Sequence, residues 1–162
     1  MKNNQIIREE LLQSVDGLSD TQINERVEEG SWTIAQVLMH LYLLERAITK
    51  TIVDQIANGN STNVEDKPIH LVTDRRKKIV APSFLEPKDD FTTLEDIKEK
   101  LTKSRDALIG VVDQADKSLL ELRAMPHPLF GAINLKQAIS FIGLHEKRHL
   151  EQIEEVKKRL ID

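Results

Sequence analysis

A pair of histidines, His145 and His149, is the feature that most constrains how this chain folds. They lie four residues apart within residues 131–160, GAINLKQAISFIGLHEKRHLEQIEEVKKRL, whose apolar residues recur with the spacing of an amphipathic helix. Side chains at positions i and i+4 of a helix share one face, with their Cβ atoms about 5 to 6 Å apart. Both imidazoles can therefore reach one metal ion without distorting the helix.

Three further segments have the same helical periodicity. The first covers residues 4–17, the second begins near Thr33 and ends at residues 58–60, and the third runs from Thr92 or Thr93 to about Ala115. Capping-box spacing, in which the first polar residue caps the helix and a residue three positions later returns the bond, marks three helix starts: Thr33 with Gln36, Thr92 with Glu95, and Asn134 with Gln137.

The connections between these helices differ in length. Residues 61–90 contain Pro68, Pro82 and Pro87 and have no sustained helical pattern, although residues 71–80 could form local helix. A connection this long in a small domain spans the body of the protein or covers a site. Residues 116–130 form another connector, and no segment has the alternating pattern of a strand pair with a hairpin turn. The sequence therefore predicts an all-α, up-and-down four-helix bundle with a long crossover between helices 2 and 3.

Composition limits the classes of function. A chain of 162 residues fits a single domain, here residues 1–162, and a net charge of −4 argues against nucleic-acid binding. The absence of cysteine excludes a disulfide framework, a cysteine zinc site and a cysteine nucleophile. No apolar run reaches the length of about 20 residues that a membrane helix needs, and no signal sequence is visible, which predicts a cytoplasmic protein without a membrane partner.

A third histidine strengthens the case for a metal site. His40 falls among the apolar positions of the second helix, between Val37, Leu41 and Leu44. A buried imidazole needs a partner, and three of them in one core favour a shared one. Helix bundles build metal sites from inward side chains of facing helices, and three protein ligands with an open position are typical of catalytic sites. His40, His145 and His149 are therefore the predicted ligands of a divalent metal.

Other polar residues receive a structural interpretation. Glu45 and Glu146 flank the histidines but lie off their face, which favours solvated or supporting carboxylates over general bases. Ser104 and Arg105 interrupt the apolar stripe of the third helix, which favours a turn that faces the surface over a role for Arg105 in the site. The basic run at residues 75–78 is interpreted as a solvated loop, with a phosphate or partner contact as the alternative.

Residues near the histidines also receive a structural interpretation. Trp32 has the spacing of a hydrophobic staple with Val37, an interpretation that we favour over a pocket wall. Gln152 follows His149 by three residues and is placed to orient its imidazole. His127, between two prolines, is interpreted as a turn residue rather than a fourth ligand, and His70 as a surface residue.

Three motifs carry a family resemblance: residues 32–41 (WTIAQVLMHL), residues 127–131 (HPLFG) and residues 145–153 (HEKRHLEQI). In this order and spacing, the chain resembles the DinB-like (YfiT-like) metalloenzyme superfamily. The resemblance implies a four-helix bundle with a long crossover, a divalent metal such as zinc or nickel held by His40, His145 and His149, and a homodimer. Nothing in the sequence supports the DNA binding that the family name brings to mind.

Characterised members of that family include S-transferases that use low-molecular-weight thiols such as bacillithiol or mycothiol, and a thiol-dependent isomerase. The resemblance therefore implies a transferase that joins a small-molecule substrate to such a thiol, whose pKa the metal would lower. Because the chain has no cysteine, the sulfur would arrive with the cosubstrate. A metal-dependent hydrolase that activates water is the alternative enzyme. A non-catalytic metal-binding or small-molecule-binding, stress-related dimer is the alternative outside enzymes.

Overall fold

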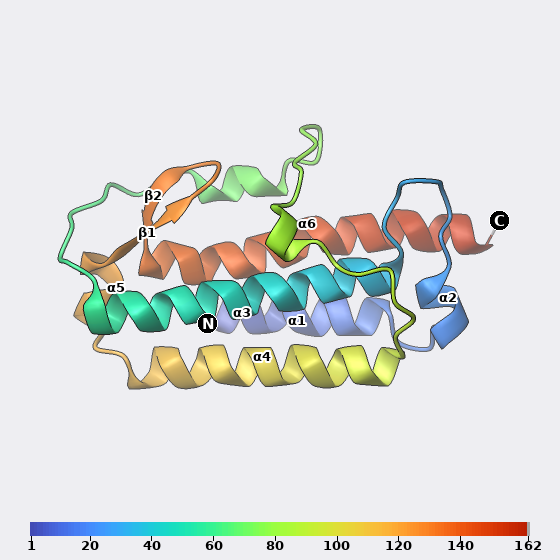
Figure 1. Cartoon of the computed structure of the whole chain (residues 1–162), viewed down its shortest axis with the longest axis horizontal. Coiled ribbons are helices and arrows are strands. Elements are labelled where there is room, and N and C mark those ends of the chain that lie inside the picture. Colours follow the sequence, from blue (N-terminus) through green and yellow to red (C-terminus); the bar gives the residue numbers. More distant parts are fainter. Residues whose placement is uncertain (162) are drawn as a thin grey trace.

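Four amphipathic helices form the body of the structure, a computed structural model that describes residues 1–161. Figure 1 shows α3 and α4 running in one direction and α1 and α6 in the other. Helices α3 and α4 are parallel because the crossover between them returns the chain to the end of the bundle at which α3 begins. The predicted four-helix bundle with a long crossover is confirmed, and its helices are α1 (Lys2–Ser14), α3 (Ile34–Asn58), α4 (Leu94–Gln114) and α6 (Leu135–Ile161).

Short elements fill the connections. The first connector contains α2 (Asp20–Asn24), and the crossover contains two 3-10 turns, η1 (Ile69–Thr73) and η2 (Ser83–Leu85). Only η1 overlaps the local helix that was expected at residues 71–80. The connector before α6 contains α5 (Lys117–Leu122), β1 (Ala124–His127) and β2 (Gly131–Asn134).

The hairpin formed by β1 and β2 contradicts the expectation that no strand pair exists. Its two strands are antiparallel, with Met125 opposite Ile133 and His127 opposite Gly131. Each strand has four residues and β1 includes Pro126, so the sequence is too short and too irregular to show strand alternation. Gly131 has a φ of 72°, a left-handed conformation that glycine adopts without strain, and it closes the turn.

Two of the three predicted helix caps are confirmed. The Thr33 hydroxyl accepts from the Gln36 backbone N–H, and the Gln36 side chain accepts from the Thr33 N–H, at 3.1 and 3.0 Å. Asn134 accepts from the Gln137 N–H at 2.8 Å, although the Gln137 side chain bonds the Lys67 backbone and does not return the bond to Asn134. The prediction for α4 was wrong by one residue, since Thr93 accepts from the Asp96 N–H and Thr92 instead donates to Asn24.

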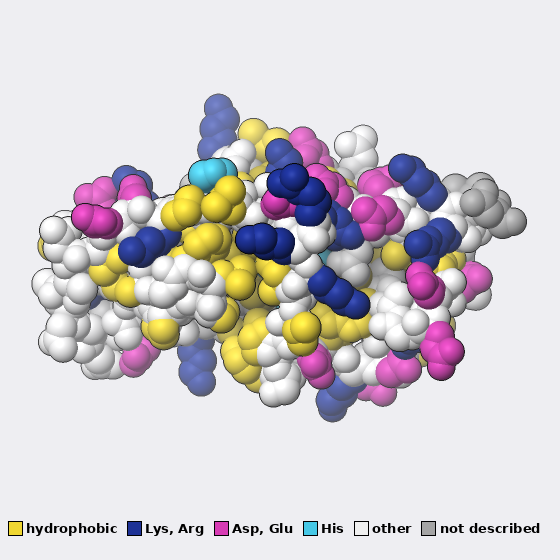
Figure 2. Space-filling model, turned by 90° about the horizontal axis from the view of Figure 1, so that it is seen from above, with side chains coloured by type: hydrophobic (Ala, Val, Ile, Leu, Met, Phe, Trp, Pro, Cys, Tyr) yellow, Lys and Arg dark blue, Asp and Glu magenta, His cyan; other side chains and the backbone are white. Residues whose placement is uncertain are grey.

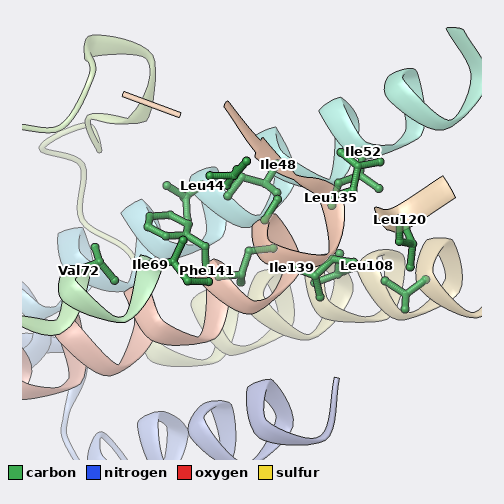
Figure 3. Packing of buried hydrophobic residues seen from close by; sticks show 14 of the residues in the cluster. Leu44, Ile48, Ile52, Ile69, Val72, Leu108, Leu120, Leu135, Ile139 and Phe141 are labelled. Atoms are coloured by element: carbon green, nitrogen blue, oxygen red, sulfur yellow. The ribbon is translucent and has the colours of Figure 1, made fainter. Parts of the chain in front are cut away.

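The apolar core has two parts that meet at the histidine-bearing turns. One part lies toward the hairpin end, where side chains of α3, α6 and the crossover pack together (Figure 3), among them Leu44, Ile48, Ile69, Val72, Ile139 and Phe141. The other part lies toward α2 and includes Leu11, Ile34, Val37, Leu41, Leu101 and Ile153. On α6, His145 and His149 lie between the residues of the two parts, and on α3 His40 lies beside Leu41 at the edge of the second part.

A buried network of charges joins all four long helices. Arg8 of α1 bonds Glu45 of α3 and Glu146 of α6, with Arg8 Nη2 2.9 Å from Glu45 and Arg8 Nε 3.0 Å from Glu146. Arg105 of α4 bonds the same two carboxylates at 2.6 and 2.9 Å. Burial raises the pKa of Glu146, and the guanidinium groups of Arg8 and Arg105 oppose this rise.

The network corrects two expectations from the sequence. Glu45 and Glu146 are not solvated, since they are 0% and 1% exposed, and Arg105 with its neighbour Ser104 does not face the surface. Each of these charged groups would be costly in the core alone, but two guanidinium groups and two carboxylates from four helices compensate one another. The interruption of the apolar stripe on α4 therefore marks an internal contact.

Removal of one member of this network should destabilise the fold strongly. We expect Arg105→Met to lower the free energy of unfolding by about 3 to 5 kcal/mol, because it leaves Glu45 and Glu146 with a single cation in the core. The control is Arg159→Met, which breaks an ion pair between Arg159 and Glu28 whose side chains are 57% and 63% exposed. That change should cost less than about 1 kcal/mol. Urea unfolding of the two variants measures the difference, and equal losses would show that the buried network does not hold the helices together.

Candidate metal centre

The structure brings His40, His145 and His149 together across the interface between α3 and α6. The Nε2 atom of His145 lies 3.4 Å from that of His40 and 3.2 Å from that of His149. Within residues 1–161, these three form a group in which one ring nitrogen atom of each residue lies within 4.8 Å of the other two, and all three residues are buried. The two residues of α6 are one helical turn apart, and the packing of α3 on α6 adds His40.

Two neighbouring acceptors orient the outer rings. His40 Nδ1 is 2.9 Å from the Leu85 carbonyl oxygen, and His149 Nδ1 is 2.7 Å from Gln152 Oε1. A carbonyl oxygen only accepts, so both Nδ1 atoms carry the proton and both Nε2 atoms present a lone pair to the centre of the group. The expected contact of Gln152 with His149 is confirmed.

His145 completes a set of nitrogen atoms that protein hydrogen bonds alone do not satisfy. Its Nδ1 is buried without a hydrogen-bond partner among the described residues. Its Nε2 faces the lone pairs of His40 and His149, and a single proton there can be donated to only one of them. A cation at the centre would accept all three lone pairs, so the donor set fits a metal ion.

The spacing of the nitrogen atoms also fits an ion of the size of zinc. Nitrogen ligands about 2.0 to 2.1 Å from a tetrahedral ion lie about 3.3 to 3.4 Å from one another. The separations of His145 Nε2 from the other two Nε2 atoms, 3.4 and 3.2 Å, agree with this spacing. These two contacts therefore need little rearrangement around a bound ion.

Burial keeps the three imidazoles in the neutral form that binds metals. It lowers the pKa of His40, and it lowers the pKa of His149 to about 3. Burial, followed by the nearby His149 and His40, holds the pKa of His145 well below its ordinary value. A neutral imidazole offers a lone pair to a metal, whereas an imidazolium does not.

Aromatic rings flank the cluster. The ring of Trp32 lies 4.9 Å from that of His40, and the ring of Phe141 lies 5.5 Å from that of His145. Trp32 packs against the core part that contains Val37, as a staple would, but it also borders the histidines, so the pocket-wall interpretation gains support. His70 is exposed and His127 lies outside the cluster, as expected, but His127 is the buried last residue of strand β1 and not the turn residue that was predicted.

The crossover is fastened to α6 beside the histidines. The buried guanidinium of Arg148 donates to the carbonyl oxygens of Val72, Asp74 and Lys77 at 3.0, 2.6 and 2.8 Å. Arg75 donates in return to the Arg148 carbonyl at 3.2 Å and pairs with Glu155 at 2.6 Å. Residue types do not reveal backbone acceptors, so neither the contacts of Arg148 nor that of the Leu85 carbonyl was predicted from the sequence.

The basic run therefore divides into two parts. Arg75 is bound to α6, whereas residues 76–78 are exposed as a solvated loop would be. Figure 2 looks onto the side of the molecule that carries the crossover and shows Lys and Arg side chains gathered near the middle of this face. No helix within residues 1–161 is both long and apolar enough to cross a membrane.

Comparison with known proteins decides the family. The model of the DinB superfamily matches residues 5–153, a span that includes all three histidines of the cluster. The chain belongs to the DinB superfamily. The chain is also similar to the uncharacterized protein YuaE of Bacillus subtilis (strain 168). The two sequences are 34% identical over 153 residues, which cover 94% of each chain.

A solved structure shares the fold of this DinB superfamily protein. The crystal structure of TT2238, a four-helix bundle protein, matches with a TM-score of 0.65 over 95% of this chain and 94% of that chain. The two sequences are 19% identical, so the likeness concerns the fold alone. Family membership and the three-histidine cluster together are compatible with a metal-binding protein.

Loss of the Gln152 contact should weaken metal binding. We expect Gln152→Leu to reduce zinc affinity about 10- to 100-fold, because His149 loses the acceptor that fixes its tautomer and orientation. Competition with a chromophoric chelator measures the affinity. Gln13→Leu, which replaces an exposed glutamine on α1, is the control and should bind zinc as the unchanged protein does. Equal affinities of both variants would contradict a role for Gln152.

Proposed function

We propose that this protein is a divalent-metal-dependent enzyme in which His40, His145 and His149 hold the ion, and that it is a transferase using a low-molecular-weight thiol. The observation that carries the proposal is the convergence of three buried Nε2 atoms on one point. Zinc and nickel both suit imidazole ligands, and we propose one of these two as the metal.

The number of ligands favours a catalytic over a structural site. Within the described residues, no carboxylate and no further histidine joins the group of three. Structural zinc sites use four protein ligands, whereas catalytic sites use three and leave a position for a small molecule. The rival proposal of a non-catalytic dimer, stiffened by its metal, does not require this open position.

A bound divalent ion would supply a Lewis acid that lowers the pKa of a thiol or a water molecule at its open position. The residues around it have distinct tasks. Leu85 and Gln152 hold His40 and His149 in orientation. Trp32 and Phe141 provide apolar surfaces that limit water and strengthen the electrostatic interactions of the site. Since the chain has no cysteine, the sulfur has to come from a cosubstrate.

The positions of the acidic residues favour a thiol over water as the nucleophile. Hydrolases of this kind commonly add a carboxylate that takes the proton from water. Glu45 and Glu146 are both committed to Arg8 and Arg105 and lie outside the histidine group. A thiol has an ordinary pKa of about 8.5, so a metal can make it a thiolate without such a base. The metal-dependent hydrolase is therefore the second candidate.

Family resemblance extends the proposal beyond the site. We propose that residues 1–162 form one domain, that the protein is cytoplasmic, and that it forms a homodimer, with a small molecule rather than a nucleic acid or a membrane as its partner. The net charge of −4 supports the exclusion of nucleic acid.

Elemental analysis tests the metal site. Protein purified without added metal should contain about one divalent ion per chain, as expected for a single three-histidine site. His149→Ala should abolish this stoichiometry, because two imidazoles remain. His70→Ala, which removes an exposed histidine of the crossover, is the control and should retain the ion. Unchanged metal content in His149→Ala would refute the proposed ligand set.

Thiol-dependent turnover tests the reaction. The metal-loaded protein should accelerate the reaction of 1-chloro-2,4-dinitrobenzene with cysteine, glutathione or bacillithiol at least about tenfold over the metal-free protein, through a lowered thiol pKa. A chelator should stop the reaction, and zinc should restore it. Background rates with every thiol would contradict the transferase. Metal-dependent hydrolysis of p-nitrophenyl acetate in the same samples would then favour the hydrolase.

A further inference from the structure

A fourth histidine, His127, is held near the cluster with an unused hydrogen-bond donor. It ends β1 opposite Gly131, and its ring lies between those of Phe130 and Phe141, at centroid distances of 5.0 and 4.4 Å. The side chain is only 8% exposed. The prolines before and after it, at positions 126 and 128, restrict the backbone. The ring is therefore fixed in place.

The tautomer of His127 follows from its contact with the turn. The backbone N–H of Leu129 donates to His127 Nδ1 at 3.1 Å, so Nδ1 holds the lone pair. Burial lowers the pKa of His127, which keeps the ring neutral, and its single proton is then on Nε2. Among residues 1–161, no acceptor for this Nε2–H is found. His127 Nε2 is not among the buried side-chain atoms that lack a partner, so this N–H lies at the exposed edge of the ring, where an acceptor from outside the protein can reach it.

Phe141 connects His127 to the metal centre. It precedes His145 by one turn of α6, and its ring lies 4.4 Å from His127 and 5.5 Å from His145. The distance between the ring centroids of His127 and His145 therefore cannot exceed the sum of these two distances.

We propose that the Nε2–H of His127 donates a hydrogen bond to an oxygen atom of the molecule that binds at the three-histidine centre. The preferred ligand then carries a carboxylate or carbonyl oxygen a few bonds away from the atom that approaches the metal. His127 is a substrate-binding residue in this arrangement, and the hairpin that holds it forms part of the substrate site. This inference rests on the proposed function, which supplies the ligand at the metal.

A simple packing role would make a different use of the same position. A phenylalanine could fill the space between Phe130 and Phe141 equally well, and no donor would be needed. The Leu129 contact instead fixes the proton on the nitrogen that has no protein partner. His127→Phe therefore separates the two roles, since it retains the aromatic ring and removes the N–H.

Thiols with and without an oxygen acceptor test the proposal. The cobalt-loaded protein is titrated with mercaptoacetate, 3-mercaptopropionate and 4-mercaptobutyrate, and with alkanethiols of equal chain length, through the sulfur-to-cobalt absorption band. At least one mercaptocarboxylate should bind about tenfold or more tightly than its alkanethiol, as expected of a hydrogen bond to a charged acceptor. In His127→Phe this preference should fall to about threefold or less, with alkanethiol affinity unchanged. An undiminished preference in the variant would overturn the proposal.

A second measurement keeps the proposal separate from the thiol chemistry. If no thiol gives the absorption band, the thiol part of the proposed function fails, and His127 is then examined in the zinc-loaded, unsubstituted protein. Its Nε2 resonance is followed by nitrogen-15 NMR during titration with propionate, which also covers the case in which His127→Phe does not fold. A shift of this resonance supports the hydrogen bond, and an unchanged resonance overturns it.

Discussion

The buried pairing of Arg8 and Arg105 with Glu45 and Glu146 is the contact on which the arrangement of the four helices depends. Each long helix contributes one charged group, and each guanidinium bonds both carboxylates. Hydrophobic contacts tolerate sliding of one helix along another, but an unpaired charge in the core does not. We infer that the network fixes the axial register of the helices, a role that is well attested for buried polar groups in helical assemblies.

The same register determines the histidine cluster. Glu146 directly follows His145, and Glu45 lies five residues after His40, so both helices that carry the histidines also carry a member of the network. A shift of α3 by one residue would move His40 about 1.5 Å along the axis, a large fraction of the 3.4 Å between its Nε2 and that of His145. The electrostatic pairing of Glu45 and Glu146 thus helps to keep the nitrogen atoms of the neighbouring histidines together.

The features that could be predicted from the sequence are those that depend on local residue patterns. The four helices, two of their caps and the convergence of His40 with His145 and His149 follow from periodicity, because a buried imidazole on an apolar stripe must face the same core as its counterparts. The hairpin was missed because strands of four residues with a proline show no alternation. Arg105 was misplaced because its partners are distant in the chain, and polarity alone cannot distinguish an outward turn from a compensated buried charge.

The crossover explains why a site made by α3 and α6 also depends on a segment outside the bundle. Leu85 of η2 supplies the acceptor that orients His40, and Arg148 binds three carbonyl groups of residues 72–77. These bonds form only when the crossover lies against α6, so the tautomer of His40 and the position of the crossover are linked. Displacement of the crossover would remove the acceptor of His40 Nδ1, so binding that moves the crossover would also change the orientation of this ring.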